Sequence, residues 1–372
     1  MNHTKTFKIV GLPGDGIGPE IYAAAMEVFA RLDELFTLQI EVEEFAIGGH
    51  AYDECGEPLP ATTLAACHKA DAILLGAVGG PKWAEVPKEL RPEQGLLALR
   101  KALNLYANIR PVSIHQPLKH LSPLKEDRIN DVDLLIVREL TGGLYFGEKQ
   151  RYENSATDLC EYSVIEIERI ARIAFELARK RNGKVSSVDK SNVLETSRLW
   201  REVVSRLHKD EYSDVELEHQ LVDSAAMHLI AHPKQFDVIL TENLFGDILS
   251  DEASMISGSL GVLPSASMSN SDPANSVTLY EPIHGSAPDI AGHDLANPTA
   301  MLLSLAMLLR HSLGRDDVAQ ALENAIYTTW ESGIFTKDLS PENYVSTTQF
   351  THTVLASIIA KRAYPNTMLR YV

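Results

Sequence analysis

Short apolar runs alternate with amphipathic stretches along the whole chain. Apolar runs of strand length predict five buried strands, at Phe7 to Val10, Ala70 to Val78, Val132 to Val137, Lys184 to Val188 and Phe236 to Leu240. Apolar residues repeating every three to four positions predict helices from about Glu20 to Asp33 and from Glu161 to Arg181. Strands that alternate with helices indicate an α/β fold with a largely parallel sheet.

The second of these helices has both a start and a stop signal. Ser163 and Glu166 have the spacing of a capping box, in which the two side chains satisfy free backbone N–H groups at the helix start. Asn182 and Gly183 follow the last apolar position and predict its end.

A glycine-rich loop, Gly14-Asp15-Gly16-Ile17-Gly18, connects the first strand to the first helix. The dinucleotide-binding motif has two residues between its second and third glycines, and here the third glycine comes one residue early and Pro19 follows. We therefore interpret the loop as a tight turn that needs positive φ, and we predict a non-Rossmann fold. A nicotinamide cofactor is compatible with a non-Rossmann fold.

The size and composition of the chain favour a globular protein with two domains. Its 372 residues are 45% hydrophobic and 23% charged. The most apolar helix-like stretch, Pro298 to Leu309, is too short to span a bilayer and predicts a buried helix. We expect no membrane partner.

The cysteines and the N-terminal sequence indicate the cytoplasm. Cys55, Cys67 and Cys160 are far apart and odd in number, so they predict neither a disulfide framework nor a zinc site. The first ten residues contain no apolar signal region.

The formal net charge of −17 makes nucleic acid an unexpected partner, and an anionic substrate would require a local cluster of basic residues. Arg100, Arg110 and Arg138 each lie among apolar residues and need a counter-charge there. A small dicarboxylate could supply it, because a guanidinium group binds a carboxylate with two hydrogen bonds. Internal salt bridges are the alternative.

Two aspartates follow the last predicted strand. Asp247 and Asp251 are four residues apart, so on a helix they share one face, where two carboxylates repel each other unless a cation lies between them. Oxygen ligands favour Mg²⁺ or Mn²⁺. The alternative is that Asp247 lies in the first turn of the helix and Asp251 is merely solvated. Asp223 has the position of an ordinary helix N-cap.

Lys190 and Tyr145 are the candidates for proton transfer. Lys190 lies just past a predicted strand, and Tyr145 lies in a loop with glycines on both sides. A lysine close to a divalent cation can act as a base, and a tyrosine beside it can deliver a proton.

The stretch from Asn243 to Val262, NLFGDILSDEASMISGSLGV, resembles the signature of the isocitrate/isopropylmalate dehydrogenase family. The resemblance continues, in order and over nearly the whole chain, through GLPGDGIGPE, GAVGGPKW, LRKALNLYANIRP, VRELTGGLYFGE, VDKSNVLETSRLWREVV and EPIHGSAPDIAG. It implies two α/β domains with a shared, largely parallel sheet, and an obligate homodimer. Residues 1–105 and 258–372 would form the NAD-binding domain, and residues 106–257 the domain for dimerisation, metal and substrate.

The same resemblance implies NAD-linked oxidative decarboxylation of 3-isopropylmalate, in leucine biosynthesis. Asp247 and Asp251 would bind Mg²⁺ or Mn²⁺ together with Asp223 of the other subunit. Lys190, also from the other subunit, would take the hydroxyl proton, and Tyr145 would protonate the enol. The residues implied in substrate binding are Arg100, Arg110, Arg138, Asp223, Glu93, Leu96, Leu97 and Val193 of the other subunit.

Two features within this resemblance narrow the choice of substrate and of cofactor. Leu96 and Leu97 suit an isopropyl group and not a third carboxylate, although helix core is the alternative for both. Asp289 would accept bonds from the adenosine ribose and repel a 2′-phosphate, which favours NAD over NADP. The residues implied in cofactor binding are Glu281, His284, Gly285, Ser286, Ala287, Asp289, Asn297, Ser259 and Gly261.

Other functions are weighed against this one. Within the class, a related dehydrogenase could use homoisocitrate or a tartrate- or malate-type acid. A Mg²⁺-dependent phosphohydrolase built on Asp247 and Asp251 would need a nucleophilic Asp-x-Asp arrangement at a strand end, which the sequence lacks. A silent nucleotide- or metal-binding protein would not need Lys190 and Tyr145 beside the three aspartates.

Overall fold

The computed structural model describes residues 6–270 and 276–363, and the chain divides into two compact units. Unit 1 comprises Met1–Leu103, Ser259–Ala266 and Asp272–Val372, and unit 2 comprises Asn104–Gly258 and Ser267–Ser271. The predicted division places residues 104 and 105, Gly258 and Ser267–Ser271 in the first domain, whereas they belong to unit 2. The functional roles predicted for the two domains remain predictions.

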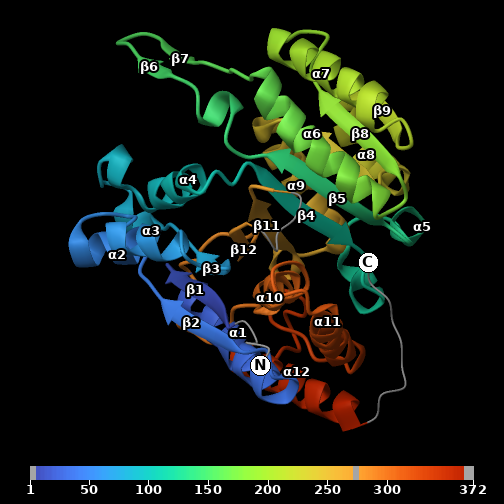
Figure 1. Cartoon of the computed structure of the whole chain (residues 1–372). Coiled ribbons are helices and arrows are strands. Elements are labelled where there is room, and N and C mark those ends of the chain that lie inside the picture. Colours follow the sequence, from blue (N-terminus) through green and yellow to red (C-terminus); the bar gives the residue numbers. More distant parts are fainter. Residues whose placement is uncertain (1–5, 271–275, 364–372) are drawn as a thin grey trace, which may run out of the picture. The chain divides into compact units, whose positions relative to one another are not determined.

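Unit 1 contains strands in the order β2-β1-β3-β12-β11, and β1 is parallel to both of its neighbours, as is β12 to β3. Its strands are β1 (Phe7–Gly14), β2 (Ile40–Glu44), β3 (Ala72–Ala77), β12 (Thr278–Pro282) and the first part of β11 (Pro264–Met268). Its helices are α1 (Gly18–Phe36), α2 (Gly48–Cys55), α3 (Ala61–Cys67), α4 (Pro92–Ala102), α10 (Thr299–His311), α11 (Asp316–Glu331) and α12 (Thr347–Ala363). Figure 1 shows α10, α11 and α12 packed side by side in this unit.

Unit 2 contains strands in the order β4-β5-β10-β8-β9, parallel except for the antiparallel pair of β4 and β5. Its strands are β4 (Ala107–Ser113), β5 (Asp133–Glu139), β8 (Lys184–Asp189), β9 (Glu216–Leu221), β10 (Val238–Thr241) and the hairpin of β6 (Lys149–Arg151) and β7 (Ala156–Asp158). Its helices are α5 (Glu126–Ile129), α6 (Val164–Arg179), α7 (Glu195–Glu211), α8 (Val222–Ala231) and α9 (Asn243–Ser257).

The core of unit 2 follows the alternation of side chains along a strand. Leu134 and Ile136 of β5 point to one face, where they pack with Leu229 of α8 and Leu249 and Ala253 of α9. Figure 1 shows α6 and α7 on the opposite face of the sheet. Both faces are therefore covered by helices, as a parallel sheet requires.

The predicted α/β fold and its largely parallel sheet are confirmed. The five predicted strands appear as β1, β3, β5, β8 and β10, and the predicted buried helix appears as α10. The predicted start of the long helix at Glu161 was wrong, because α6 begins at Val164 and Ser163 is its N-cap with the full capping box. Strand β10 begins at Val238 and not at Phe236, whose N–H closes a turn on the carbonyl of Pro233.

The glycine-rich loop between β1 and α1 is the tight turn that its spacing predicts. Gly14 and Gly16 have φ of 75° and 59°. The N–H of Asp15 donates to Ala77 O and the N–H of Gly18 donates to Asp15 O, so these amides are not directed at a phosphate. Across the described residues, no helix is both long enough and apolar enough to cross a membrane.

Candidate active site

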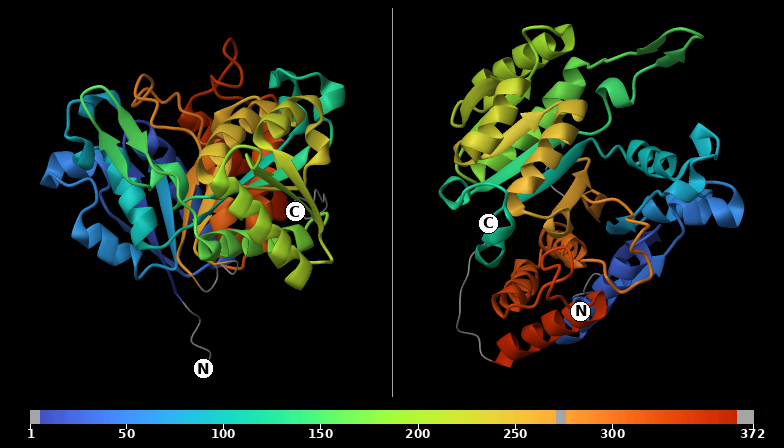
Figure 2. Two further views of the ribbon diagram at one scale, coloured as in Figure 1. Left: turned by 90° about the horizontal axis from the view of Figure 1, so that it is seen from above. Right: turned by 180° about the vertical axis from the view of Figure 1, so that it is seen from behind.

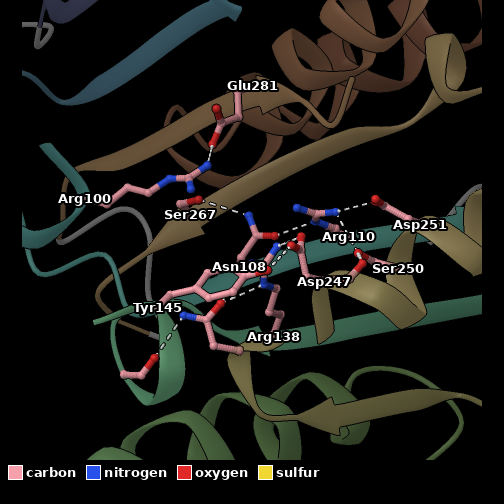
Figure 3. A network of polar contacts seen from close by, with 12 residues as sticks. Arg100, Asn108, Arg110, Arg138, Tyr145, Asp247, Ser250, Asp251, Ser267 and Glu281 are labelled. Atoms are coloured by element: carbon pink, nitrogen blue, oxygen red, sulfur yellow. Dashed lines mark hydrogen bonds and ion pairs between the residues drawn. The ribbon is translucent and has the colours of Figure 1, made fainter. Parts of the chain in front are cut away.

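A cluster of polar side chains lies in unit 2 where β4 and β5 face α9 (Figure 3). Arg110 comes from β4, Arg138 from β5, and Asp247 and Asp251 from α9. Gly246 lets the helix approach the strand, because a Cβ there would lie 2.6 Å from Cγ of Arg138. The fold thus brings two predicted substrate arginines to the two predicted metal ligands.

Arg138 is almost completely buried and is held on two sides. Its Nη1 lies 2.5 Å from Oδ1 of Asp247, and its Nε and Nη2 donate to Oδ1 of Asn243 over 3.1 and 2.9 Å. The Asn243 amide also donates to the carbonyl of Gly142 over 3.1 Å. Asp247 therefore balances the positive charge of this guanidinium, and the bonds to Asn243 fix its direction.

Arg110 is fixed in the same way. Its Nε donates to Oδ1 of Asn108 and its Nη1 to Oγ of Ser250, each over 2.7 Å, and Nη1 lies 3.5 Å from Oδ1 of Asp251. Nδ2 of Asn108 donates in turn to Oγ of Ser267 over 3.0 Å. The internal salt bridges weighed as the alternative for these arginines are present, and their partners are the two aspartates proposed as metal ligands.

Tyr145 joins the cluster through its hydroxyl, which donates to Oδ2 of Asp247 over 2.6 Å. Burial first, and then the bond and the negative charge of Asp247, raise the pKa of this phenol to about 12. The hydroxyl consequently keeps its proton at neutral pH, which is the state that a proton donor needs.

The aspartate pair offers oxygen ligands that suit a hard divalent cation. Asp247 and Asp251 are one turn apart, and the Asp251 side chain is 66% exposed and so open to a ligand from solvent. Partial burial mainly, and also the nearby Asp247, raise the pKa of Asp251, whereas Arg110 lowers it. The first helical turn contains no acidic residue, so the alternative that Asp247 serves the helix start was wrong.

Asp223 and Lys190 pair with each other. Lys190 Nζ lies 2.6 Å from Oδ1 of Asp223, which is the second residue of α8. The N-cap of α8 is Leu221, without a side-chain cap, so the N-cap interpretation of Asp223 was wrong. Among the described residues of the single chain, no three acidic, His or Cys side chains are grouped as a metal site. Asp223 is thus not beside Asp247 and Asp251 within this chain.

In unit 1, the predicted substrate residues of α4 share one face of the helix. These residues are three and four positions apart: Glu93, Leu96, Leu97 and Arg100. None of the four is fully buried, whereas the other side of the helix buries Pro92, Gly95 and Leu99. Leu96 and Leu97 are half-buried, so both keep a part of their apolar surface open in the single chain. Arg100 is held by Glu281, with Nη2 2.5 Å from Oε1 (Figure 3).

Apart from Glu281, which pairs with Arg100, the predicted cofactor residues of unit 1 fall into two groups. Ser259 Oγ and Asn297 Nδ2 both donate to Oδ2 of Asp338, over 2.7 and 3.0 Å, and the N–H of Gly261 donates to Ser259 Oγ. His284 lies on a segment with the exposed Asp289. Its Nε2 is buried and has no hydrogen-bond partner among the described residues, and burial lowers its pKa. A buried ring nitrogen without a partner and a nearby open carboxylate fit a polar ligand such as NAD.

Several residues that organise the site had no role in the sequence-based prediction. Asn243 and Ser250 lie on the same face of α9 as the aspartates, so helical spacing could have indicated them. Asn108 and Asp338 gave no such signal, because their partners are far away in the sequence.

Comparison with known proteins agrees with this arrangement. The profile of the isocitrate/isopropylmalate dehydrogenase family matches residues 8–354. The chain is 57% identical to the 3-isopropylmalate dehydrogenase of Staphylococcus saprophyticus, over 93% of this chain and 98% of that protein. It is 54% identical to the 3-isopropylmalate dehydrogenase of Bacillus subtilis, over 96% and 99%.

Two solved structures show the same fold. The isocitrate dehydrogenase of Methylococcus capsulatus matches with a TM-score of 0.85 and 35% identity, over 95% of this chain and 99% of that chain. A β-decarboxylating dehydrogenase of Thermococcus kodakarensis matches with a TM-score of 0.80 and 32% identity, over 98% and 100%. This chain therefore belongs to the isocitrate/isopropylmalate dehydrogenase family.

Proposed function

We propose that this protein catalyses the NAD-linked oxidative decarboxylation of 3-isopropylmalate to 4-methyl-2-oxopentanoate, a step of leucine biosynthesis. The observation that carries the proposal is the cluster of Arg110, Arg138, Tyr145, Asp247 and Asp251, which joins carboxylate-binding groups, carboxylate ligands and a protonated phenol. The relatives with the highest identity quoted above bear the name of this activity.

The substrate is a dicarboxylate, and Arg100, Arg110 and Arg138 would bind its two carboxylates. Each guanidinium is already held by other side chains, so it loses little conformational freedom when the substrate binds. Leu96 and Leu97, partly exposed beside Arg100 on one helix face, would contact the isopropyl group together with Val193 of the partner subunit. Glu93 lies on the same face.

The proton transfers belong to two residues. Lys190 Nζ would take the proton of the 2-hydroxyl group as hydride leaves C2, and the carbon freed by loss of CO₂ would take the Tyr145 phenol proton. NAD⁺, when bound, accepts the hydride. A divalent cation, when bound by Asp247 and Asp251 with Asp223 of the partner subunit, supplies positive charge that stabilises the electrons left by CO₂.

Residues of unit 1 would hold the cofactor. Asp289 is exposed and can accept bonds from two ribose hydroxyls, while its charge opposes a 2′-phosphate, which favours NAD over NADP. The other residues that we assign to cofactor binding are Glu281, His284, Gly285, Ser286, Ala287, Asn297, Ser259 and Gly261.

We also propose a homodimer with shared active sites. Apart from Leu260, Tyr344 and Ile359, the large apolar side chains exposed in the described chain lie in unit 2. Met227 and Ile230 of α8, for example, are 63% and 52% exposed. The β6–β7 hairpin, whose residues are all exposed, extends away from the rest of unit 2 (Figure 2). Such a surface favours a large subunit interface. The free cysteines support the cytoplasm as the compartment.

A matrix of substrates and cofactors tests the proposal. NADH or NADPH formation is measured with 3-isopropylmalate, isocitrate, homoisocitrate and malate, each with NAD or NADP and with or without a chelator. We expect the highest kcat/KM with 3-isopropylmalate and NAD, and loss of turnover with the chelator that Mg²⁺ or Mn²⁺ restores. A higher kcat/KM with isocitrate or homoisocitrate would contradict the substrate assignment.

A further inference from the structure

The segment that we assign to cofactor binding is a long loop. Residues 283–298, between β12 and α10, form turns and irregular structure only. A loop of this length loses much conformational entropy when it is ordered, so a binding loop needs fixed points elsewhere in the fold. Two such points come from residues at the start of α1.

The first fixed point is the glycine-rich loop. The N–H of Ile17 donates to the carbonyl of Ser286 over 2.8 Å. A Cβ at Gly16 would lie 2.1 Å from that carbonyl oxygen and 2.8 Å from Cβ of Ser286. The absence of a side chain at Gly16 therefore allows the segment to lie directly on this turn.

The second fixed point is the carboxylate of Glu20, in the first turn of α1. Its Oε2 accepts from the N–H of Gly292 over 3.2 Å, and its Oε1 accepts from the N–H of Ala296 over 3.1 Å. Oγ1 of Thr347, at the start of α12, donates to the same Oε1 over 2.7 Å. One side chain thus joins two points of the loop to the starts of α1 and α12.

We propose that Gly16 and Glu20 are positioning residues for NAD binding, which hold the segment 284–297 in its binding shape without touching the cofactor. The inference rests on the proposed role of this segment in NAD binding. It also gives the glycine-rich loop a task, since this loop supports the cofactor segment in place of binding a phosphate itself.

Two variants with matched controls test the proposal. Glu20→Gln keeps the shape of the side chain but turns an amide N–H₂ towards the N–H of Gly292. Its control is Glu27→Gln, which removes another carboxylate of α1, one that pairs with the exposed His352 and not with the 284–297 segment as far as the described residues show. Gly16→Ala places a methyl group against Ser286. Its control is Gly56→Ala, because Gly56 also has positive φ, 80°, but no atom within 4 Å of an added Cβ.

The measurements are NAD affinity by calorimetry, hydrogen exchange of the 284–297 amides without cofactor, and steady-state kinetics. For Glu20→Gln we expect roughly tenfold weaker NAD affinity, the effect of losing one bond to a charged group, and faster exchange at Gly292 and Ala296. Gly16→Ala should have a larger effect. The kcat at saturating NAD and the KM for 3-isopropylmalate should stay within about twofold of wild type, and both controls should bind NAD like wild type.

Each other result has a distinct meaning. If the wild-type protein binds no NAD, the proposed function fails, and this inference with it. If wild type binds NAD and both variants bind it equally well, only the positioning role is overturned. Equal losses in kcat and in the affinities for NAD and 3-isopropylmalate would indicate general destabilisation and would also overturn it. If Gly16→Ala does not fold, Glu20→Gln decides.

Discussion

At the scale of single residues, Tyr145 is the most direct test of the chemistry. Tyr145→Phe removes the hydroxyl bonded to Asp247 and leaves Arg110 and Arg138 in place. We expect kcat to fall about 100-fold, the usual effect of losing a general acid, with little change in the KM for 3-isopropylmalate. Steady-state NADH formation measures both. Tyr152→Phe, on the exposed β6–β7 hairpin, is the control, and an unchanged kcat for Tyr145→Phe would contradict the assignment.

Glu242 provides a prediction about pH. Burial raises its pKa from 4.5 to about 7; its bond with Ser197 opposes the shift, and the charge of Asp189 adds to it. The carboxyl of Glu242 therefore holds its proton more tightly in the folded than in the unfolded protein. Its contribution to the free energy of unfolding is fully present below pH 4.5 and is lost as the pH rises to about 7.

Glu242→Gln removes this loss. The free energy of unfolding of the variant relative to wild type should increase as the pH rises from 5 to 8, by on the order of 3 kcal/mol at most. Thermal unfolding midpoints at both pH values measure the difference. Glu202→Gln, at an exposed position of α7, should show no such gain, and a pH-independent difference for Glu242→Gln would sink the prediction.

At the scale of elements, the capping box of α6 should contribute measurably to stability. Oγ of Ser163 accepts from the N–H of Glu166, and the Glu166 carboxylate accepts from the N–H of Ser163. Ser163→Ala should cost about 1 kcal/mol and lower the thermal midpoint by roughly 2–4 °C. Ser163→Thr keeps the hydroxyl and should remain close to wild type, so an equal loss in both variants would speak against the cap.

The beginning of α6 also shows where local signals end. Apolar spacing continued the helix back to Glu161, but the carbonyl of Glu161 accepts from the N–H of Gly143 and the hydroxyl of Tyr162 accepts from the N–H of Asn243. These partners are distant in the sequence, and they hold the residues before Ser163 outside the helix. The cap itself could be predicted because its two members are three residues apart.

At the scale of the whole molecule, the proposed sharing of active sites between two subunits makes a prediction for mixed dimers. Lys190→Ala and Asp247→Asn should each abolish turnover alone. If each site takes Asp247 from one subunit and Lys190 from the other, a mixed dimer contains one intact site. Co-expression at equal amounts should then restore about a quarter of the wild-type activity.

Differently tagged subunits allow the mixed dimer to be purified and assayed for NADH formation. No activity in the purified mixed dimer would mean that both residues serve the same site from one chain. Lys190 and Asp223 are already paired within one chain, away from the aspartate pair of α9, so the two residues should act together from one subunit.

Features that depend on neighbours along the chain could be predicted from the amino-acid order alone. The alternation of strands and helices, the turn at Gly14 and Gly16, and the common face of Asp247 and Asp251 all follow from local periodicity and backbone preference. In contrast, the pairing of Arg138 with Asp247, of Arg100 with Glu281, and of Glu20 with Gly292 and Ala296 became visible only in the folded chain. Such partners are far apart in sequence, and they meet because the order of strands in each sheet and the packing of helices on it bring them together, which no local pattern encodes.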